Sequence, residues 1–237
     1  MPEILPDLQQ KIAGTLEILH RSVIEDTPVT FASSLGAEDM VLTDLIYRHV
    51  PQIRDFTLDT GRLPEETYAL LQELRSHYGR APRIHFPKAD SVEEYTAANG
   101  PNGFYSSVAL RKRCCGIRKV DPLRRALNGH GAWITGLRRD QSVTRNALVV
   151  REWDSVNSLY KISPLADWSD GDVWAYIRAH GVPYNRLHDQ NFPSIGCAPC
   201  TRAISPGEDI RAGRWWWELA ETRECGLHWP PSPGEQL

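Results

Sequence analysis

Short apolar strands alternate with helical segments between residues 6 and 135, and this alternation constrains the fold more than any other feature. Leucine, isoleucine and valine at helical spacing predict a helix over residues 6–26, and Pro64 followed by two glutamates predicts the first turn of another. Alternating strands and helices predict an α/β fold with a doubly wound, mostly parallel sheet. The predicted strands are residues 29–33, 54–58, 83–86 and 132–135.

The 237 residues, 41% of them hydrophobic, are enough for one globular unit with its own core. We expect an N-terminal helical segment at residues 1–27 and a nucleotide-binding α/β domain at residues 28–188. Residues 189–237 are expected to form a C-terminal arm of the same globular unit. The arm is predicted to be loop-like because prolines and glycines interrupt it.

The net charge of −3 argues against a dedicated nucleic-acid binder, because such proteins carry a basic excess. No apolar run approaches the roughly 18 residues of a membrane span. The first residues include acids and lack the apolar core of a secretory signal, so we expect a cytoplasmic protein. In a reducing compartment, clustered cysteines are more often metal ligands or redox thiols than disulfides.

The five cysteines form a pattern of four plus one. Cys114 and Cys115 are adjacent, Cys197 and Cys200 form a C-x-x-C pair, and Cys225 stands alone. Four thiolates complete one tetrahedral metal site or one iron–sulfur cluster. Adjacent cysteines are unusual for zinc and can reach separate irons, so we favour a cluster. The alternative is that the adjacent pair consists of buried small hydrophobic residues.

The remaining cysteine is a candidate nucleophile. Arg223 and His228 supply positive potential near Cys225, and Gly226 gives the backbone freedom. An inert C-terminal cysteine is the alternative. Lys119 follows Cys115 by about one helical turn, so its ammonium group is expected near both the cysteines and a bound anion.

Two loops at predicted strand ends are candidates for a nucleotide site. The loop at residues 33–39 joins a strand to a helix, where backbone N–H groups favour an anion, although the lysine of a phosphate-binding loop is absent. The segment at residues 58–61 supplies an acid that suits a ribose or adenine edge. Helix capping and a plain turn explain the same residues. The candidate residues are Ser33, Ser34, Gly36, Asp39, Leu58, Asp59, Thr60 and Gly61.

Two arginine pairs are candidates for binding phosphate or sulfate oxygens. Arg138 and Arg139 follow the fourth predicted strand, and a guanidinium group donates two parallel hydrogen bonds to such an anion. Arg211 and Arg214 are spaced to share a helix face. Pairing with nearby acids is the alternative for the first pair, and exposure to solvent is the alternative for the second.

Six motifs together resemble the assimilatory sulfonucleotide reductases, and within them the branch that acts on adenosine 5′-phosphosulfate (APS). They occur in family order between about residues 28 and 228. The motifs are S-x-G-A-E-D at 34–39, L-D-T-G-R at 58–62, C-C-x-x-x-K at 114–119, G-x-R-R-D-Q-S at 136–142, P-S-I-G-C-x-P-C-T-R at 193–202 and E-C-G-L-H at 224–228.

This resemblance implies an adenine-nucleotide α-hydrolase-like fold and reduction of APS to sulfite and AMP in sulfate assimilation. It implies that Cys225 attacks the sulfate sulfur, and that thioredoxin then releases sulfite from the resulting S-sulfocysteine. It also implies a [4Fe–4S] cluster on the other four cysteines. Arg223 stands where many relatives have lysine, which keeps the charge. The residues that the resemblance implies around the sulfate and phosphate are Lys119, Arg211, Arg214 and His228.

Three other functions stay open from the sequence. A reductase of the 3′-phosphorylated substrate (PAPS) mostly lacks the cluster cysteines, so their presence favours APS. An ATP-dependent tRNA thiolase usually carries S-G-G-x-D-S, whereas this chain has S-S-L-G-A-E-D at residues 33–39. A non-enzymatic, metal-binding regulatory module would give neither the nucleotide loop nor Cys225 a purpose. A homo-oligomer is neither indicated nor excluded.

Overall fold

The computed structural model describes residues 6–141 and 147–219. Its described residues divide into two compact units, which are treated separately below. Unit 1 takes those within Met1–Thr57, Glu66–Arg83 and Gly129–Asn185, and unit 2 takes those within Leu58–Glu65, Ile84–Asn128 and Arg186–Leu237. Each unit combines separate stretches of sequence, whereas the predicted segments 1–27, 28–188 and 189–237 are continuous. That predicted division is not tested by the two units and stays a prediction.

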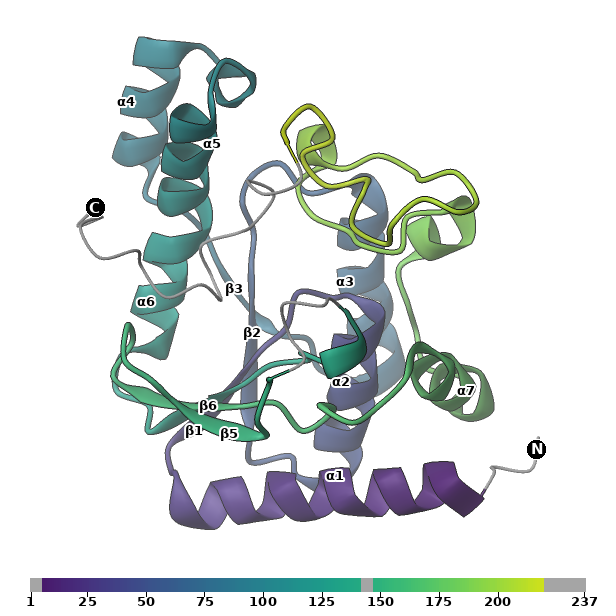
Figure 1. Cartoon of the computed structure of the whole chain (residues 1–237). Coiled ribbons are helices and arrows are strands. Elements are labelled where there is room, and N and C mark those ends of the chain that lie inside the picture. Colours follow the sequence, from purple (N-terminus) through teal and green to yellow (C-terminus); the bar gives the residue numbers. More distant parts are fainter. Residues whose placement is uncertain (1–5, 142–146, 220–237) are drawn as a thin grey trace. The chain divides into compact units, whose positions relative to one another are not determined.

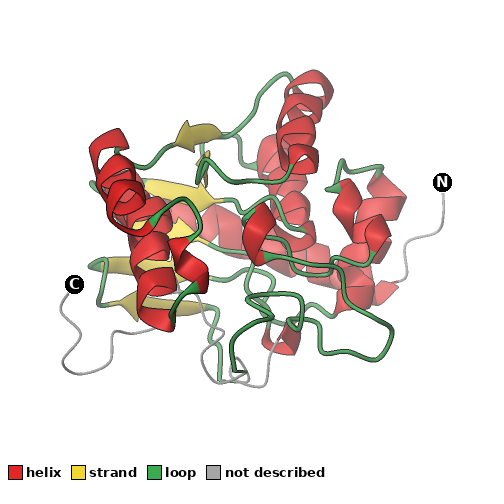
Figure 2. Cartoon of the chain, turned by 90° about the horizontal axis from the view of Figure 1, so that it is seen from above, coloured by secondary structure: helices red, strands yellow, loops and turns green. Residues whose placement is uncertain are grey.

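The described strands form one six-stranded sheet with the order β3-β2-β1-β4-β6-β5. Figure 2 shows the strands in yellow among the red helices. β1 pairs in parallel with both β2 and β4, β4 pairs in parallel with β6, and only the β5–β6 pair is antiparallel. The predicted mostly parallel α/β fold is therefore confirmed. The strands are β1 (Val29–Ala32), β2 (Arg54–Leu58), β3 (Arg83–His85), β4 (Ala132–Ile134), β5 (Arg151–Asp154) and β6 (Leu159–Ile162).

Four helices pack with the strands around the core of unit 1 (Figure 1). Residues 39–46, in the second of these helices, are all buried, because this helix is enclosed by its neighbours on every side. A capping box between Ser169 and Asp172 begins the last of them. The helices are α1 (Pro6–Glu25), α2 (Ala37–His49), α3 (Glu65–Tyr78) and α7 (Asp170–His180).

Unit 2 is built from helices and turns. Figure 1 shows one continuous helical run, in which α5 leads through a π-helical turn, η2, into α6. Within the described part of residues 189–237, the regular structure consists of short 3₁₀ turns and one isolated β-bridge between Thr201 and Arg214. The elements are α4 (Ala89–Asn99), η1 (Gly103–Tyr105), α5 (Val108–Cys115), η2 (Gly116–Val120), α6 (Asp121–Leu127), η5 (Arg186–Gln190) and η6 (Ala198–Cys200).

We expect Asp44→Ala to lower the free energy of unfolding by about 2–4 kcal/mol, because buried donors lose their acceptor. Asp44 is fully buried and accepts hydrogen bonds from Arg48, Tyr78 and Tyr176 at 2.7, 2.6 and 2.8 Å. Urea unfolding measures the loss. Glu17→Ala is the control, because its ion pair with an arginine is exposed and its removal should change stability by less than about 0.5 kcal/mol. Equal losses in both variants would contradict the prediction.

Candidate active site

The loop after β1 is shaped by its own side chains. Ser34 donates its backbone N–H and its hydroxyl to Asp39 Oδ2, both at 2.6 Å. Leu35 N–H donates to Ser33 Oγ at 3.2 Å, and Gly36 caps α2. Asp39 and Ser33 are therefore engaged within the loop. The loop still leads into the N-terminus of a 13-residue helix, which suits an anion.

The residues after β4 lie against this loop. A Cβ on Gly136 would stand 2.2 Å from Asp39 Oδ1 and 3.0 Å from Glu38 Cβ, so a larger residue does not fit without displacement. β1 and β4 are neighbouring parallel strands, and the chain leaves β1 for β2 on the other side. Ligands of doubly wound sheets bind at such a point, outside the carboxyl ends of the strands. The fold therefore agrees with a nucleotide site in unit 1.

The first arginine pair contacts acids of the protein itself. Arg138 is buried and donates from Nε and Nη2 to Glu38 Oε1, at 3.0 and 2.8 Å. Gln141 donates to the same oxygen at 2.8 Å. Arg139 forms an ion pair with Asp167. These contacts correspond to the alternative interpretation of the sequence, in which the two arginines pair with acids of the protein. Binding of substrate by either arginine stays a prediction.

The segment after β2 belongs to unit 2 and lies beside a cysteine. Asp59 Oδ1 accepts from Gly61 N–H at 2.7 Å, which closes a turn in which Gly61 has a φ of 70°. Thr60 Oγ1 lies 3.2 Å from Cys197 Sγ. Leu58, at the end of the strand, is half-buried. The turn therefore helps to position a thiol, a contact that its sequence did not indicate.

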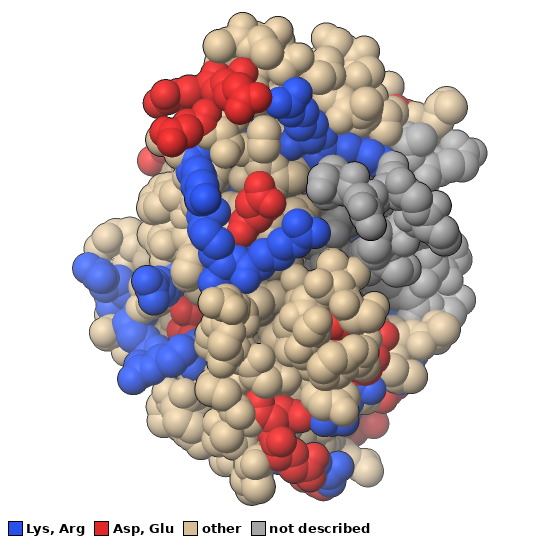
Figure 3. Space-filling model, turned by 90° about the vertical axis from the view of Figure 1, so that its left-hand side faces the viewer, with Lys and Arg blue, Asp and Glu red and all other residues tan. Residues whose placement is uncertain are grey.

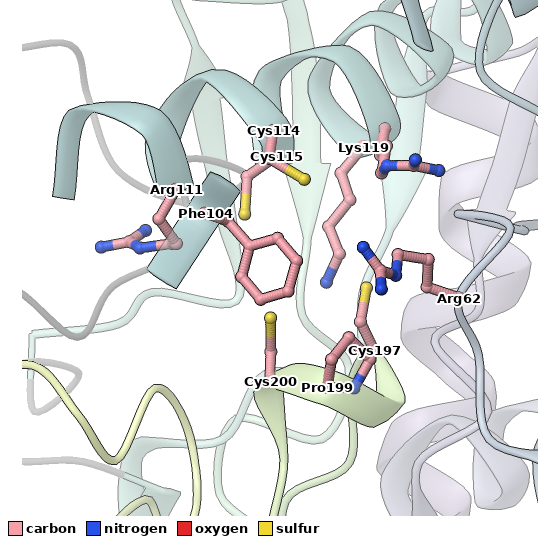
Figure 4. A pocket seen from close by; sticks show the side chains of 10 residues that line it. Arg62, Phe104, Arg111, Cys114, Cys115, Lys119, Cys197, Pro199 and Cys200 are labelled. Carbon is pink, nitrogen blue, oxygen red and sulfur yellow. The ribbon is translucent and has the colours of Figure 1, made fainter. Parts of the chain in front are cut away.

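Four cysteines line one cavity of about 310 Å³ in unit 2, part of it open to solvent (Figure 4). Cys114 and Cys115 end α5. Cys197 lies just before turn η6, and Cys200 is the last residue of that turn. All four are free thiols. Figure 4 shows the two pairs facing each other across the cavity. The other lining residues are Arg62, Phe104, Arg111, Arg118, Lys119 and Pro199.

The π-helical turn η2 brings cations to the cavity. A π turn holds more residues per turn than an α-helix, and such turns are frequent at functional sites. Lys119 extends its ammonium group into the cavity (Figure 4). Arg118 donates to the carbonyl of Thr60 at 2.6 Å. Lys119 thus lies beside the cysteines, where the sequence places it.

The thiols are buried in a way that disfavours their ionisation. Burial raises the pKa of Cys114. Burial, together with the charge of Cys197, raises the pKa of Cys200 to about 12, against the opposing charges of Lys119 and Arg214. These two thiols therefore keep their protons at neutral pH, and a metal that binds them must displace the protons.

The donor set fits an iron–sulfur cluster better than one metal ion. Around a single tetrahedral zinc, with Zn–S bonds of about 2.3 Å, the sulfurs lie about 3.8 Å apart. Within residues 6–141 and 147–219, no three His, Cys, Asp or Glu side chains come together closely enough to hold one ion. Four free thiols gathered around one cavity could hold a four-iron cluster, in which each iron takes one thiolate.

Arg211 lies in a turn and Arg214 in an isolated β-bridge with Thr201, so they do not share a helix face. Arg214 N–H donates to the carbonyl of Arg211 at 2.9 Å. The side chain of Arg214 is buried and donates to Ile195 O at 3.0 Å. A Cβ on Gly196 would lie 2.2 Å from Arg214 Nη2, so this glycine leaves room for the guanidinium group.

Two candidate residues, Cys225 and His228, lie outside the described residues. The cavity also contains residues that the sequence analysis did not select. Two of them had a signal in the sequence, since Arg118 is next to Lys119 and Arg111 precedes Cys115 by one helical turn. Arg62 and Pro199 stand in the quoted motifs at 58–62 and 193–202, whereas Phe104 had no signal in the sequence.

The surface carries both signs of charge. On the face in Figure 3, blue and red side chains are interspersed among the residues that the structure describes. This mixture agrees with the small net charge of −3. No helix in the described ranges is long and apolar enough to cross a membrane.

The fold and the cysteine cavity agree with a sulfonucleotide reductase, and comparison with known proteins shows the family. The phosphoadenosine phosphosulfate reductase domain matches residues 28–203, so the chain belongs to this family. A relative from Allochromatium vinosum, named adenosine 5′-phosphosulfate reductase, is 57% identical and covers 93% of this chain and 86% of its own length. A relative of the same name from Burkholderia cepacia is 51% identical over 95% of this chain and 90% of its own length. The expectation of an enzyme from this family is confirmed.

Solved structures agree with this placement. Phosphoadenylyl-sulfate (PAPS) reductase from Candida auris, crystallised with phosphate, is 26% identical and superposes with a TM-score of 0.69, covering 85% of this chain and 98% of its own. FMN adenylyltransferase from Candida glabrata, with FMN and an ATP analogue, has a TM-score of 0.59 at 15% identity, covering 92% and 74%. The second likeness supports the fold alone.

Titration of Asp39 should affect stability between about pH 4 and 6. Burial raises the pKa of Asp39 to about 6, although hydrogen bonds from Ser34 act in the opposite direction. In this interval the folded chain binds a proton that the unfolded chain releases, so this group makes the fold more stable as pH falls. Carboxyl ¹³C shifts should show a midpoint near 6. Asp39→Asn should remove that titration and its contribution to the pH dependence of the free energy of unfolding. A midpoint near 4 for the Asp39 carboxyl shift in the unaltered protein would contradict the prediction.

Proposed function

We propose that the protein reduces APS to sulfite and AMP, with reduced thioredoxin as electron donor, in cytoplasmic sulfate assimilation toward cysteine. The observation that carries this proposal is the relative named APS reductase that is 57% identical over 93% of the chain. The cavity adds support, because four free thiols and several cations gather in it.

Cys225 is the proposed nucleophile. Its thiolate attacks the sulfur of APS, an S–S bond forms as the bond from sulfur to the bridging phosphate oxygen breaks, and AMP leaves. A thioredoxin thiolate then attacks Cys225 Sγ and releases sulfite. The second thioredoxin thiol completes a disulfide and restores the cysteine thiol, so the thiols supply both electrons. One hard step is thereby divided into two easier ones.

Cations are needed because an anionic thiolate approaches an anionic sulfonate. Lys119 lies in the cavity, and Arg214 is buried close enough for its charge to affect Cys200. The nucleotide is assigned to the loop at residues 33–39 and the turn at residues 58–61. The proposed sulfate and phosphate ligands are Lys119, Arg138, Arg139, Arg211, Arg214 and His228.

A [4Fe–4S] cluster is the proposed cofactor, held by Cys114, Cys115, Cys197 and Cys200. When bound, it supplies a metal centre beside the cations that bind the substrate. The chain orients its ligands, since Thr60 Oγ1 contacts Cys197 Sγ at 3.2 Å. Such outer contacts fix the direction of a ligand.

The proposed mechanism predicts that Cys225→Ser binds APS and retains iron but releases no sulfite. Unaltered protein given APS without thioredoxin should gain one SO₃ group, about 80 Da, on the peptide that contains Cys225, because the second step is blocked. Mass spectrometry of the digest measures this gain. An adduct on Cys200 instead, or activity retained by the serine variant, would refute the mechanism.

The cluster assignment predicts that Cys197→Ala loses iron, acid-labile sulfide and the broad visible absorbance, because one of four ligands is missing. Iron analysis of anaerobically purified protein measures this loss. Cys225→Ser is the matched control and should keep all three signals. Zinc in the unaltered protein, or a complete cluster in Cys197→Ala, would refute the assignment.

Reduction of PAPS is the second candidate. The family description and the likeness to the Candida auris enzyme favour it. We expect kcat/KM to be at least about a hundredfold higher for APS, because a 3′-phosphate without a partner leaves buried charge unpaired. Steady-state assays with both nucleotides measure the ratio, and equal efficiencies would favour the second candidate.

A further inference from the structure

A buried ion pair joins α5 to the segment that follows the second cysteine pair. Arg111 Nε and Nη2 donate to Glu218 Oε1 and Oε2, each at 2.9 Å. The two side chains are 1% and 3% exposed. Taking two charges out of water costs free energy that their attraction repays only in part, so stability alone does not explain the pair.

Arg111 also lies close to a candidate cluster ligand, Cys115. It lies one helical turn before Cys115 on α5, and both residues line the cavity. Burial disfavours the charge of the guanidinium group, but the contacts with Glu218 and Cys115 raise the pKa of Arg111 above its ordinary value. A fixed cation at this position is close enough to act as an outer partner of the coordinating sulfur when a cluster is bound.

The ion pair also connects the two walls of the cavity. Glu218 N–H donates to Trp215 O at 2.9 Å, and Trp215 N–H donates to Cys200 O at 3.2 Å. The guanidinium carbon of Arg111 lies 4.7 Å from the centre of the Trp215 ring. A short chain of contacts therefore runs from Cys115 on one wall to Cys200 on the other.

We propose that Arg111, oriented by Glu218, is a positioning residue for the iron–sulfur cluster. In this role, Arg111 donates a hydrogen bond to Cys115 and, through Glu218, fixes the separation of the two cysteine pairs. This inference rests on the proposed cluster. It accounts for a buried charge at a place where an apolar pair of equal size would cost less free energy. Loss of such an outer partner commonly lowers metal affinity by about 10–100-fold.

The test compares Arg111→Met, Glu218→Gln and the double variant Arg111→Met/Glu218→Met as anaerobically purified holoprotein. Iron and sulfide per chain, the rate of iron transfer to a ferrous chelator and the free energy of unfolding are measured. Both single variants should release iron at least about tenfold faster. The double apolar variant should regain unfolding free energy but still release iron as fast as the single variants.

Two variants serve as controls. Arg113→Met/Glu94→Gln removes an ion pair that also involves α5 but is exposed, with side chains 50% and 75% accessible, and should release iron at the unaltered rate. Arg111→Lys keeps the charge without the two-bond geometry and should release iron at an intermediate rate.

Iron release at the unaltered rate in the double apolar variant would show that the pair is only structural, and would overturn the inference. If Arg111→Met does not fold, the double variant decides the question. Unaltered protein without iron would refute the proposed cofactor, and this inference with it. If the unaltered protein contains iron and the variants release it at the unaltered rate, the role of Arg111 would be overturned, whereas the proposed cofactor would stand.

Discussion

Parallel pairing of β1 with β2 on one side and with β4 on the other is the constraint on which the organisation of unit 1 depends. Parallel neighbours end at the same edge of a sheet, so the loops after β1 and β4 must meet there. Gly136 makes this approach sterically feasible, because a Cβ would collide with Asp39. Asp39 in turn binds Ser34 and sets the course of the first loop. The candidate nucleotide site is thus a consequence of strand order.

Unit 2 is organised differently, because polar contacts around the cysteines form much of its interior. Its small apolar cluster contains Tyr95, Phe104 and Cys114, so a candidate ligand is also a core residue. Other contacts cross the cavity region, including those of Arg118 with Thr60 and of Arg111 with Glu218. A bound cluster would therefore stabilise this unit as well as serve its chemistry.

Strands β1 to β4 could be predicted from the sequence, because each is a short segment between loops and helices and most of their residues are apolar. The β5–β6 hairpin was not predicted, since β5 is an edge strand whose residues are alternately exposed and half-buried, which weakens the apolar signal. The gathering of the four cysteines could be predicted from their spacing and chemistry. The enclosure of Arg138 could not, because its partner Glu38 is 100 residues away and only the fold brings them together. The contacts of Arg62 and Phe104 with the cavity are non-local in the same way.

Burial of Cys114 and Cys200 has a consequence for the metal-free chain. Because the pKa of each thiol is raised, both stay protonated at neutral pH, and a protonated thiol is a poor nucleophile. Oxidants and alkylating reagents therefore react slowly with them.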